Sequence, residues 1–391
     1  MTTDTITTHF DYHSIDHNLL KLDILGHDDP TMIRMLQDLT GRDPLTIPLD
    51  GRDVMSLFQN TDALGITPEQ IGGTKLGCLG IPEFGTDFAM NMVIEAQPQT
   101  FSDLVRISGL SHGTNVWVGN AQDLIRDGIA TISTCVCTRD DIMTYLINKG
   151  VEPEKSFKIM EAVRKGTVAK KKIDPKLWEA WKEDMLAHDV PQWYLESCQK
   201  IEYMFPKAHA AAYVMMAWRI AYCKIHYPLA YYGAFFSIRA KAFSYEQMCQ
   251  GQAHMEAIMK EYKRRMDAVS NKEPGAQPLS NKEELAYGDM RVVQEMYARG
   301  FQFEPIDIFR AKSRSFQIVG DKLMPSLSSI DGLGEKAADA IVEAAKDGPF
   351  LSRDDFRERT KVSKTIVDLM AELGLLGDLP ESNQLSLFDF Q

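Results

Sequence analysis

The chain has 391 residues, of which 44% are hydrophobic and 25% charged, a composition typical of a soluble protein with about two or three domains. Its formal net charge of −12 excludes a uniformly basic nucleic-acid binder, so any contact with nucleic acid must be local. The sequence has no apolar run of about 18 residues and no signal-peptide pattern, and its cysteines are scattered. These features predict a cytoplasmic protein with reduced thiols and no membrane contact.

The first informative stretch, KLDILGHDD (residues 21–29), predicts a short strand that carries an acid. In a strand, Leu22 and Ile24 would lie on one face and Asp23 on the other. A solvated Asp23 explains this pattern without any function. A carboxylate held on a strand can also bind a divalent metal, but such a site needs at least one more carboxylate.

Helical spacing of apolar residues dominates the rest of the chain, which predicts a mainly α fold. The spacing stays near 3.6 residues from about 100 to 240. A charged helix follows over 255–269, and 270–284 (SNKEPGAQPLSNKEE) predicts a flexible connector. Beyond 288 we expect an amphipathic helix, a short strand pair near SFQIVGDKLMP, and a compact helical end.

Two segments in the middle of the chain predict a ligand site. FPKAHAAAYVMMAWRIAYCKIHYP (205–228) predicts a long helix between two prolines, with Lys207 and His209 at its N-terminus and Tyr213 one turn further on. Cations beside the first amides of a helix favour an anion, although a buried helix with a satisfied core histidine explains the pattern equally well. SGLSHGTNVWVGN (108–120) predicts a glycine-rich loop that either wraps a ligand or turns a corner.

The stretch SSIDGLGEKAADAIVEAA (328–345) resembles a helix-hairpin-helix motif. Gly332, Leu333 and Gly334 form the hairpin, and Lys336 follows in the first turn of a helix with Ala337, Ala340, Ile341 and Ala344 inward. Glycines let the backbone approach a phosphate, and the first amides of the helix can bind it without reading the base sequence. A plain glycine turn is the alternative. A second copy over 359–374 lacks the glycines, so we expect it to be structural.

Six strings occur in an order that resembles the PolC-type bacterial DNA polymerase III alpha subunit, a C-family replicative polymerase. They are LLKLDILGHDDPT, GIPEFGT, ISGLSHGT, RDDIMTYLI, FPKAHAAAY and NQLSLF. The resemblance runs from about residue 7 to 388 and implies the C-terminal part of such a polymerase. It implies a C-terminal piece of a polymerase-β-like palm (1–35), helical fingers (36–240), a clamp-binding region (241–377) with the helix-hairpin-helix at about 326–374, and a tail (378–391).

The resemblance implies template-directed addition of dNTPs to a primer 3′-hydroxyl by two-metal phosphoryl transfer. Asp23 would be the third of three palm aspartates that hold two Mg²⁺ ions, and its two partners are not in this sequence. One carboxylate cannot hold two ions, so we expect the chain alone to be inactive.

The resemblance also implies binding residues and partners. The dNTP would contact fingers residues Ser111, His112, Arg164, Lys165, Lys207, His209 and Tyr213. Lys170–Lys172 is expected to be solvated. In the tail, QLSLF would dock on the β sliding clamp through Gln384, Leu385, Ser386, Leu387 and Phe388. Further expected partners are a DNA primer–template, other replisome subunits and the upstream polymerase half. The alternative function is a non-catalytic module that binds DNA and the sliding clamp.

Overall fold

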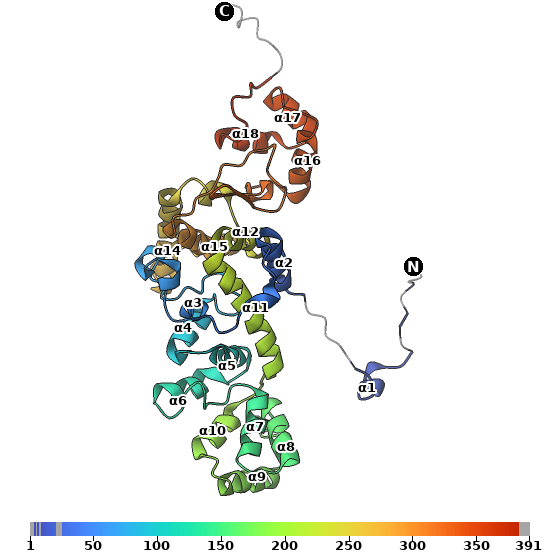
Figure 1. The fold of residues 1–391 in the computed structure, drawn as a ribbon, viewed down its shortest axis with the longest axis vertical. Helices are drawn as coiled ribbons and strands as arrows, with labels where there is room; N and C mark the ends of the chain where they lie inside the picture. The colour runs from blue at the N-terminus through green and yellow to red at the C-terminus, as the bar shows by residue number, and fades with distance from the viewer. Residues whose placement is uncertain (1–3, 5, 8, 21–25, 383–391) are drawn as a thin grey trace, which may run out of the picture.

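The computed structural model of the chain describes residues 4, 6–7, 9–20 and 26–382. Asp23 and the predicted clamp-binding residues 384–388 lie outside these described residues. The fold is mainly α, as predicted, and the helical body is elongated (Figure 1). None of its described helices is long and apolar enough to cross a membrane.

The α-helices are α1 (Tyr12–Ile15), α2 (Asp28–Thr40), α3 (Arg52–Ser56), α4 (Asp87–Ala96), α5 (Phe101–His112), α6 (Gln122–Arg126), α7 (Arg139–Asn148), α8 (Pro153–Arg164), α9 (Pro175–Ala187), α10 (Gln192–Lys200), α11 (Lys207–His226), α12 (Pro228–Ala234), α13 (Tyr245–Met248), α14 (Gln252–Ser270), α15 (Asn281–Ala298), α16 (Glu335–Ala345), α17 (Arg353–Thr360) and α18 (Lys364–Glu372). Short 3₁₀ or π turns are η1 (Pro44–Thr46), η2 (Asp62–Leu64), η3 (Pro68–Ile71), η4 (Trp117–Ala121), η5 (Phe235–Arg239) and η6 (Leu327–Ser329).

Helix α11 runs along the long axis of the body, between α7–α10 at one end and α12 toward the other (Figure 1). It forms where predicted because Pro206 caps its start, alanines fill its first turns, and Pro228 begins the next helix. Trp218 is fully buried and donates its indole N–H to the Pro48 carbonyl at 2.8 Å. The helix packs against α2, α3, α5 and α7, so residues on it can meet residues from several distant segments.

A buried ion pair joins α11 to α15. Lys224 and Glu295 are both fully buried, with Nζ 2.8 Å from Oε1. The ammonium also donates to the carbonyls of Gly77 and Leu79, at 2.8 and 2.7 Å, and Tyr232 donates to the carboxylate at 2.7 Å. The ammonium is thus surrounded by acceptors, and the carboxylate accepts from donors, so the hydrogen-bonding needs of this buried ion pair are met inside the core.

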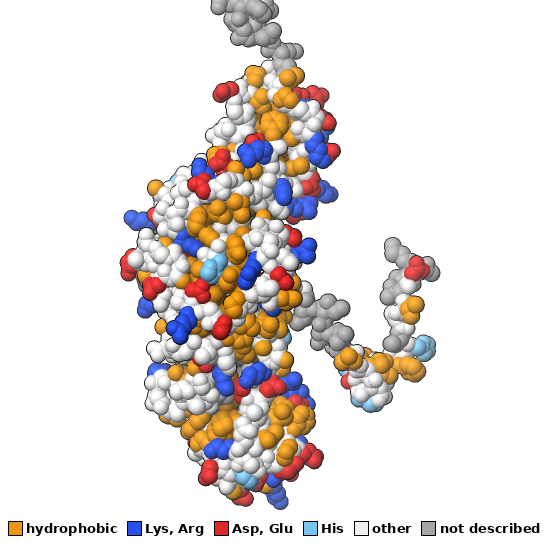
Figure 2. All heavy atoms as spheres, in the orientation of Figure 1, with side chains coloured by type: hydrophobic (Ala, Val, Ile, Leu, Met, Phe, Trp, Pro, Cys, Tyr) orange, Lys and Arg blue, Asp and Glu red, His pale blue; other side chains and the backbone are white. Residues whose placement is uncertain are grey.

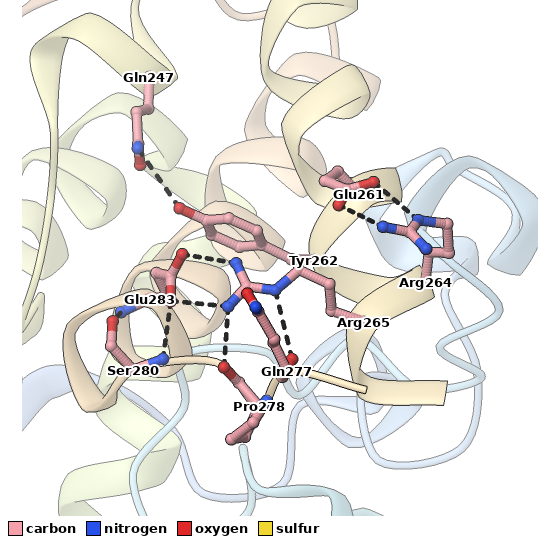
Figure 3. A network of polar contacts seen from close by, with 9 residues as sticks. All are labelled: Gln247, Glu261, Tyr262, Arg264, Arg265, Gln277, Pro278, Ser280 and Glu283. Carbon is pink, nitrogen blue, oxygen red and sulfur yellow. Dashed lines mark hydrogen bonds and ion pairs between the residues drawn. The ribbon is translucent and has the colours of Figure 1, made fainter. Parts of the chain in front are cut away.

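The connector between α14 and α15 is shorter than predicted and is held in place by hydrogen bonds (Figure 3). Arg265 on α14 donates to the Pro278 carbonyl at 2.8 Å and to Glu283 at 2.7 Å. Glu283 in turn accepts from the Ser280 amide at 2.7 Å, and the Ser280 hydroxyl accepts from the Glu283 amide at 3.3 Å. This capping box and the arginine fix a segment whose prolines and polar residues had predicted a flexible loop.

The C-terminal region has its own hydrophobic core. The predicted strand pair is present as β1 (Gln317–Val319) and β2 (Lys322–Met324), which are antiparallel. Beyond it α16, α17 and α18 pack around Leu327, Ile341, Phe356 and Met370, all at most 1% exposed. Helices α14 and α15 pack instead into the larger core with α11, so hydrophobic packing groups most of 241–303 with the preceding helices.

Candidate nucleotide and DNA sites

Three of the predicted nucleotide residues meet where the end of α5 faces the start of α11. His112 lies in the last turn of α5, and His209 and Tyr213 lie on α11. The ring centroids of His112 and His209 are 6.2 Å apart, and those of His209 and Tyr213 are 4.4 Å apart. Phe205 also contacts both histidines, at 5.4 and 5.0 Å. We call His112, Phe205, His209 and Tyr213 the ring cluster.

The predicted glycine-rich loop at 108–120 was wrong in its first half, because residues 108–112 belong to α5. Gly109 lies inside this helix, where a Cβ would come 2.5 Å from the Thr138 side chain and 3.0 Å from the Cys137 carbonyl. The glycine therefore serves close packing rather than a turn. Ser111 donates its hydroxyl to the Ser108 carbonyl at 2.9 Å, beside the His112 ring.

Both ring nitrogens of His112 face acceptors. Nε2 is 2.8 Å from Glu83 Oε2, and Nδ1 is 2.7 Å from the Ser108 carbonyl. The hydrogen bond to Glu83 raises the pKa of His112 above its ordinary value, against the effect of burial. Burial raises the pKa of Glu83, but the hydrogen bond and charge of His112 lower it overall. His209 has the opposite shift, since burial and the nearby His112 charge lower its pKa.

Sequence reasoning missed the acids and the arginine beside the ring cluster. Glu83 comes from the turn before α4, and the Asp29 side chain on α2 is only 1% exposed and forms an ion pair with Arg239. His27 lies 3.3 Å from Asp29, and its ring contacts that of Tyr213 with the centroids 4.6 Å apart. Burial raises the pKa of Asp29, although Arg239 and His27 oppose this shift. The one signal in the sequence was an acid inside the glycine and proline turn GIPEFGT.

Lys207 points toward α7 rather than into the ring cluster. Its ammonium lies 3.3 Å from Asp141 Oδ1, and its amide donates to Asp140 Oδ2 at 2.6 Å. Asp141 also accepts from the Thr138 amide and hydroxyl at the start of α7. Lys207, Asp140 and Asp141 line a cavity of about 390 Å³ that Arg106 and Trp193 also line. Lys207 is therefore already paired in this structure.

Arg164 and Lys165 lie together at the end of α8 and share one carboxylate. Glu161 accepts from Arg164 Nη2 at 2.8 Å and from Lys165 Nζ at 3.0 Å. The hydrogen bond from Arg164 lowers the pKa of Glu161 to about 2. The Arg164 carbonyl accepts from the Met204 amide at 3.3 Å. Because Met204 directly precedes Phe205, this hydrogen bond links the end of α8 to the segment that enters the ring cluster. Lys170–Lys172 is exposed, as predicted.

The predicted hairpin leads directly into the first turn of α16. Gly332 has a left-handed φ of 80°, and a Cβ there would meet Ile366 at 2.9 Å. Leu333 is buried and anchors the turn, and Gly334 caps α16. Ala338 donates the first backbone hydrogen bond of α16, to the Gly334 carbonyl at 3.0 Å. The amides at 335–337 before it have no backbone partner among the described residues. Lys336 is exposed beside them.

The inward face of α16 differs slightly from the prediction. Ala338, Ile341 and Ala344 are buried, whereas Ala337 and Ala340 are only partly buried. The hairpin is tied to the preceding region through Asp331, which accepts from Ser244 and from Lys282, the latter at 3.1 Å. Charges on the face in Figure 2 are mixed, with lysines and arginines between acids, as expected for local rather than uniform contact with a polyanion.

No group of three or more histidines, cysteines or acids that could hold a metal ion occurs within the described ranges. All six cysteines are free thiols. Asp23, the one residue predicted to bind Mg²⁺, lies outside the described residues. The part of the chain that the structure describes therefore offers no carboxylate set that fits a two-ion site.

Known proteins match both regions of the chain. A family model of the bacterial DNA polymerase III alpha subunit finger domain matches residues 29–189, and a helix-hairpin-helix motif matches residues 300–385. DNA polymerase III PolC-type from Streptococcus pneumoniae is 54% identical over 389 residues, which is 100% of this chain and 26% of that protein. The protein of the same name from Streptococcus pyogenes is 53% identical over 98% of this chain and 25% of its own length. The chain thus spans about a quarter of these curated relatives, and it belongs to the PolC-type DNA polymerase III family, whose C-terminal part it matches.

Proposed function

We propose that the chain supplies the fingers and a DNA-binding module of a replicative DNA polymerase, which adds dNTPs to a primer 3′-hydroxyl under the direction of a template. The 54% identity to PolC-type polymerases along the whole chain carries this proposal. Bound Mg²⁺ would supply the charge that stabilises the transferred phosphoryl group. Because Asp23 is the one metal-binding residue we assign to this chain, the other carboxylates must come from elsewhere, and the chain alone is inactive.

The ring cluster is the proposed nucleotide pocket. The Tyr213 and His209 rings contact each other at 4.4 Å with a tilt of 43°, and flat aromatic faces of this kind bind nucleobases. His209 stays neutral because its pKa is lowered, so it can stack without repelling a nearby cation. From α5, His112 contributes a ring to the pocket, and the Ser111 hydroxyl lies beside that ring.

The cations around the pocket are the proposed triphosphate contacts. Lys207, Arg164 and Lys165 are all paired with acids in this structure, through Asp141 and Glu161. A triphosphate must therefore compete with a carboxylate for each of them. Such exchange costs little for side chains that stay partly exposed, as these three do.

The hairpin is the proposed contact to the DNA backbone. The amides of 335–337, which have no backbone partner among the described residues, and the exposed Lys336 can bind one phosphate without reading the bases. The tail residues 384–388 are the proposed tether to the β sliding clamp, and tethering beside a DNA contact would raise processivity. If the polymerase activity is absent, DNA and clamp binding by these two segments is the second candidate function, which the open hairpin amides favour.

The nucleotide pocket can be tested in a polymerase assembled from this chain and the upstream part of the relatives. Replacing Tyr213 by alanine removes the stacking face, and we expect the KM for dNTPs to rise about tenfold, as the loss of one stacked base contact would cause. Tyr222→Ala is the matched control, because the Tyr222 ring makes a similarly tilted contact with His226 of the same helix at 4.2 Å, away from the ring cluster. Equal KM changes in both variants would remove the ring cluster from the nucleotide site.

A further inference from the structure

Glu83, which contacts His112, has an unfavourable backbone conformation. Glu83 has a left-handed φ of 69°, which is uncommon for a residue with a side chain. Among the other described non-glycine residues in this conformation, Gln97, Asp189, Lys272 and Lys361 follow the ends of helices, where left-handed residues are usual. Glu83 instead lies in the turn before α4. The turn is tight, since a Cβ on Gly85 would meet the Ile81 carbonyl at 2.9 Å.

The two acceptors around His112 determine its protonation. A carbonyl oxygen and an ionised carboxylate can only accept, and they lie 2.7 Å and 2.8 Å from Nδ1 and Nε2. The Ser111 hydroxyl also lies 3.0 Å from Nδ1, but it donates its proton to the Ser108 carbonyl at 2.9 Å. With both acceptors bound, each ring nitrogen carries a proton and the ring is an imidazolium. Its charge is matched by Glu83, whose side chain is 11% exposed, and the pair together carries no net charge.

The other charged groups around His112 leave this assignment unchanged. From α11, the neutral His209 faces it. From the start of α2, His27 and Asp29 act on Glu83 rather than directly on His112, and Arg239 from η5 neutralises Asp29. Glu83 is therefore the anion that decides the state of the His112 ring.

We infer that Glu83 is a positioning residue of the nucleotide pocket, which fixes the His112 ring and holds its second proton to a higher pH than a free imidazole would. This inference rests on the proposed function for its link to nucleotides, but the His112–Glu83 part stands by itself. A free imidazole would titrate near pH 6.5, within the range in which a polymerase must work. The carboxylate shifts that titration to higher pH and places an opposite charge beside the ring.

The first test follows the His112 ring directly in the 391-residue chain. NMR of ¹³C-histidine-labelled protein from pH 5 to 9 gives the titration of each ring, and the His112 signal is assigned with His112→Gln. We expect His112 in the wild type to titrate above about pH 6.5 and in Glu83→Gln at or below that value. Glu83→Asp keeps the charge and a side chain that tolerates the left-handed backbone, so it should give an intermediate value. Glu246→Gln, an exposed acid on α13, is the control.

If His112 titrates at the same pH in the wild type and Glu83→Gln, the inference is overturned. If circular dichroism shows that Glu83→Gln does not fold, the Glu83→Asp variant decides the question. A His112 titration in Glu83→Asp at the same pH as in the wild type would then overturn the inference.

The second test links the pair to nucleotides in the polymerase assembled with the upstream part. We compare the ratio of the dNTP KM at pH 8 to that at pH 6 between variants, so that ionisation of the nucleotide itself cancels. In Glu83→Gln a bare imidazolium appears only at low pH, and we expect this ratio to exceed the wild-type ratio by on the order of fivefold. Superimposed profiles would overturn the inference if Tyr213→Ala does raise the KM. If Tyr213→Ala and Glu83→Gln both leave the KM unchanged while the NMR shift is present, the proposed nucleotide pocket is wrong instead.

Discussion

The ring cluster and the hairpin are built in opposite ways. The ring cluster and the charged residues beside it come from α5, α11, the start of α2 and the turn before α4, which are far apart in the sequence. The proposed DNA contact of the hairpin comes from residues 332–337 alone, mostly from backbone amides. A side-chain site depends on the packing of its distant segments, whereas a backbone site depends on one local conformation. The two should therefore respond to different substitutions.

The largest expected effect comes from breaking the buried ion pair between Lys224 and Glu295, which joins α11 to α15. Lys224→Ala leaves Glu295 buried without a counter-charge, and we expect it to lower the free energy of unfolding of the larger core by about 3–5 kcal/mol. The double variant Lys224→Met, Glu295→Leu removes both charges and should recover most of this loss. Urea unfolding followed by tryptophan fluorescence measures it.

Lys263→Ala is the control for the buried pair, since Lys263 forms an exposed pair with Asp267 and its loss should be within about 1 kcal/mol. The C-terminal core has separate packing, so amide exchange in α16–α18 should change little in any of these variants. Equal destabilisation of both cores would show that the two regions are not separable.

The next effect distinguishes the two hairpin glycines. Gly332→Ala must adopt φ near 80° and displace Ile366, which should cost about 1–2 kcal/mol of stability. Gly334 has an ordinary φ of −70° and open space, so Gly334→Ala tests the approach of the phosphate with little effect on folding. Replacing both glycines by valine would confuse binding with folding.

For DNA binding, Lys336→Ala should weaken duplex binding equally for all sequences and reduce the salt slope by about 1. Lys346→Ala, at the other end of α16, should leave the slope unchanged. Fluorescence anisotropy over a salt series gives both values. A Lys336→Ala slope equal to that of the wild type would make the hairpin a structural turn.

The smallest expected effect is on the stability of the fold at acid pH. The hydrogen bond from Arg265 lowers the pKa of Glu283 to about 2 from an unfolded value of 4.5. A lowered pKa in the folded state gives stability that is present above pH 4.5 and is lost as the pH falls through 2. In Glu283→Gln this loss should be smaller, so the urea midpoints of the two proteins should converge between pH 4.5 and 2. Parallel midpoints would mean that the network in Figure 3 adds nothing to stability.

The sequence predicted the local features and missed the assembled ones. The bounds of α11, the strand pair and the hairpin follow from prolines, glycines and apolar spacing within one segment. The pairings of Glu83 with His112 and of Lys207 with Asp141 depend on how distant helices pack, which no local pattern encodes. Gly109 predicted a loop because its role in close helix packing is visible only beside the Cys137 carbonyl. The roles of Asp23 and of residues 384–388 stay predictions.

Primer extension tests the central claim most directly, namely that this chain is one part of a polymerase whose metal site is completed elsewhere. The chain is incubated with primer–template, dNTPs and Mg²⁺, alone and together with the upstream part of a PolC-type relative. We predict no extension by the chain alone and extension by the combination, which Asp23→Asn in this chain should abolish. Extension by the chain alone, or full activity of the combination with Asp23→Asn, would contradict the account.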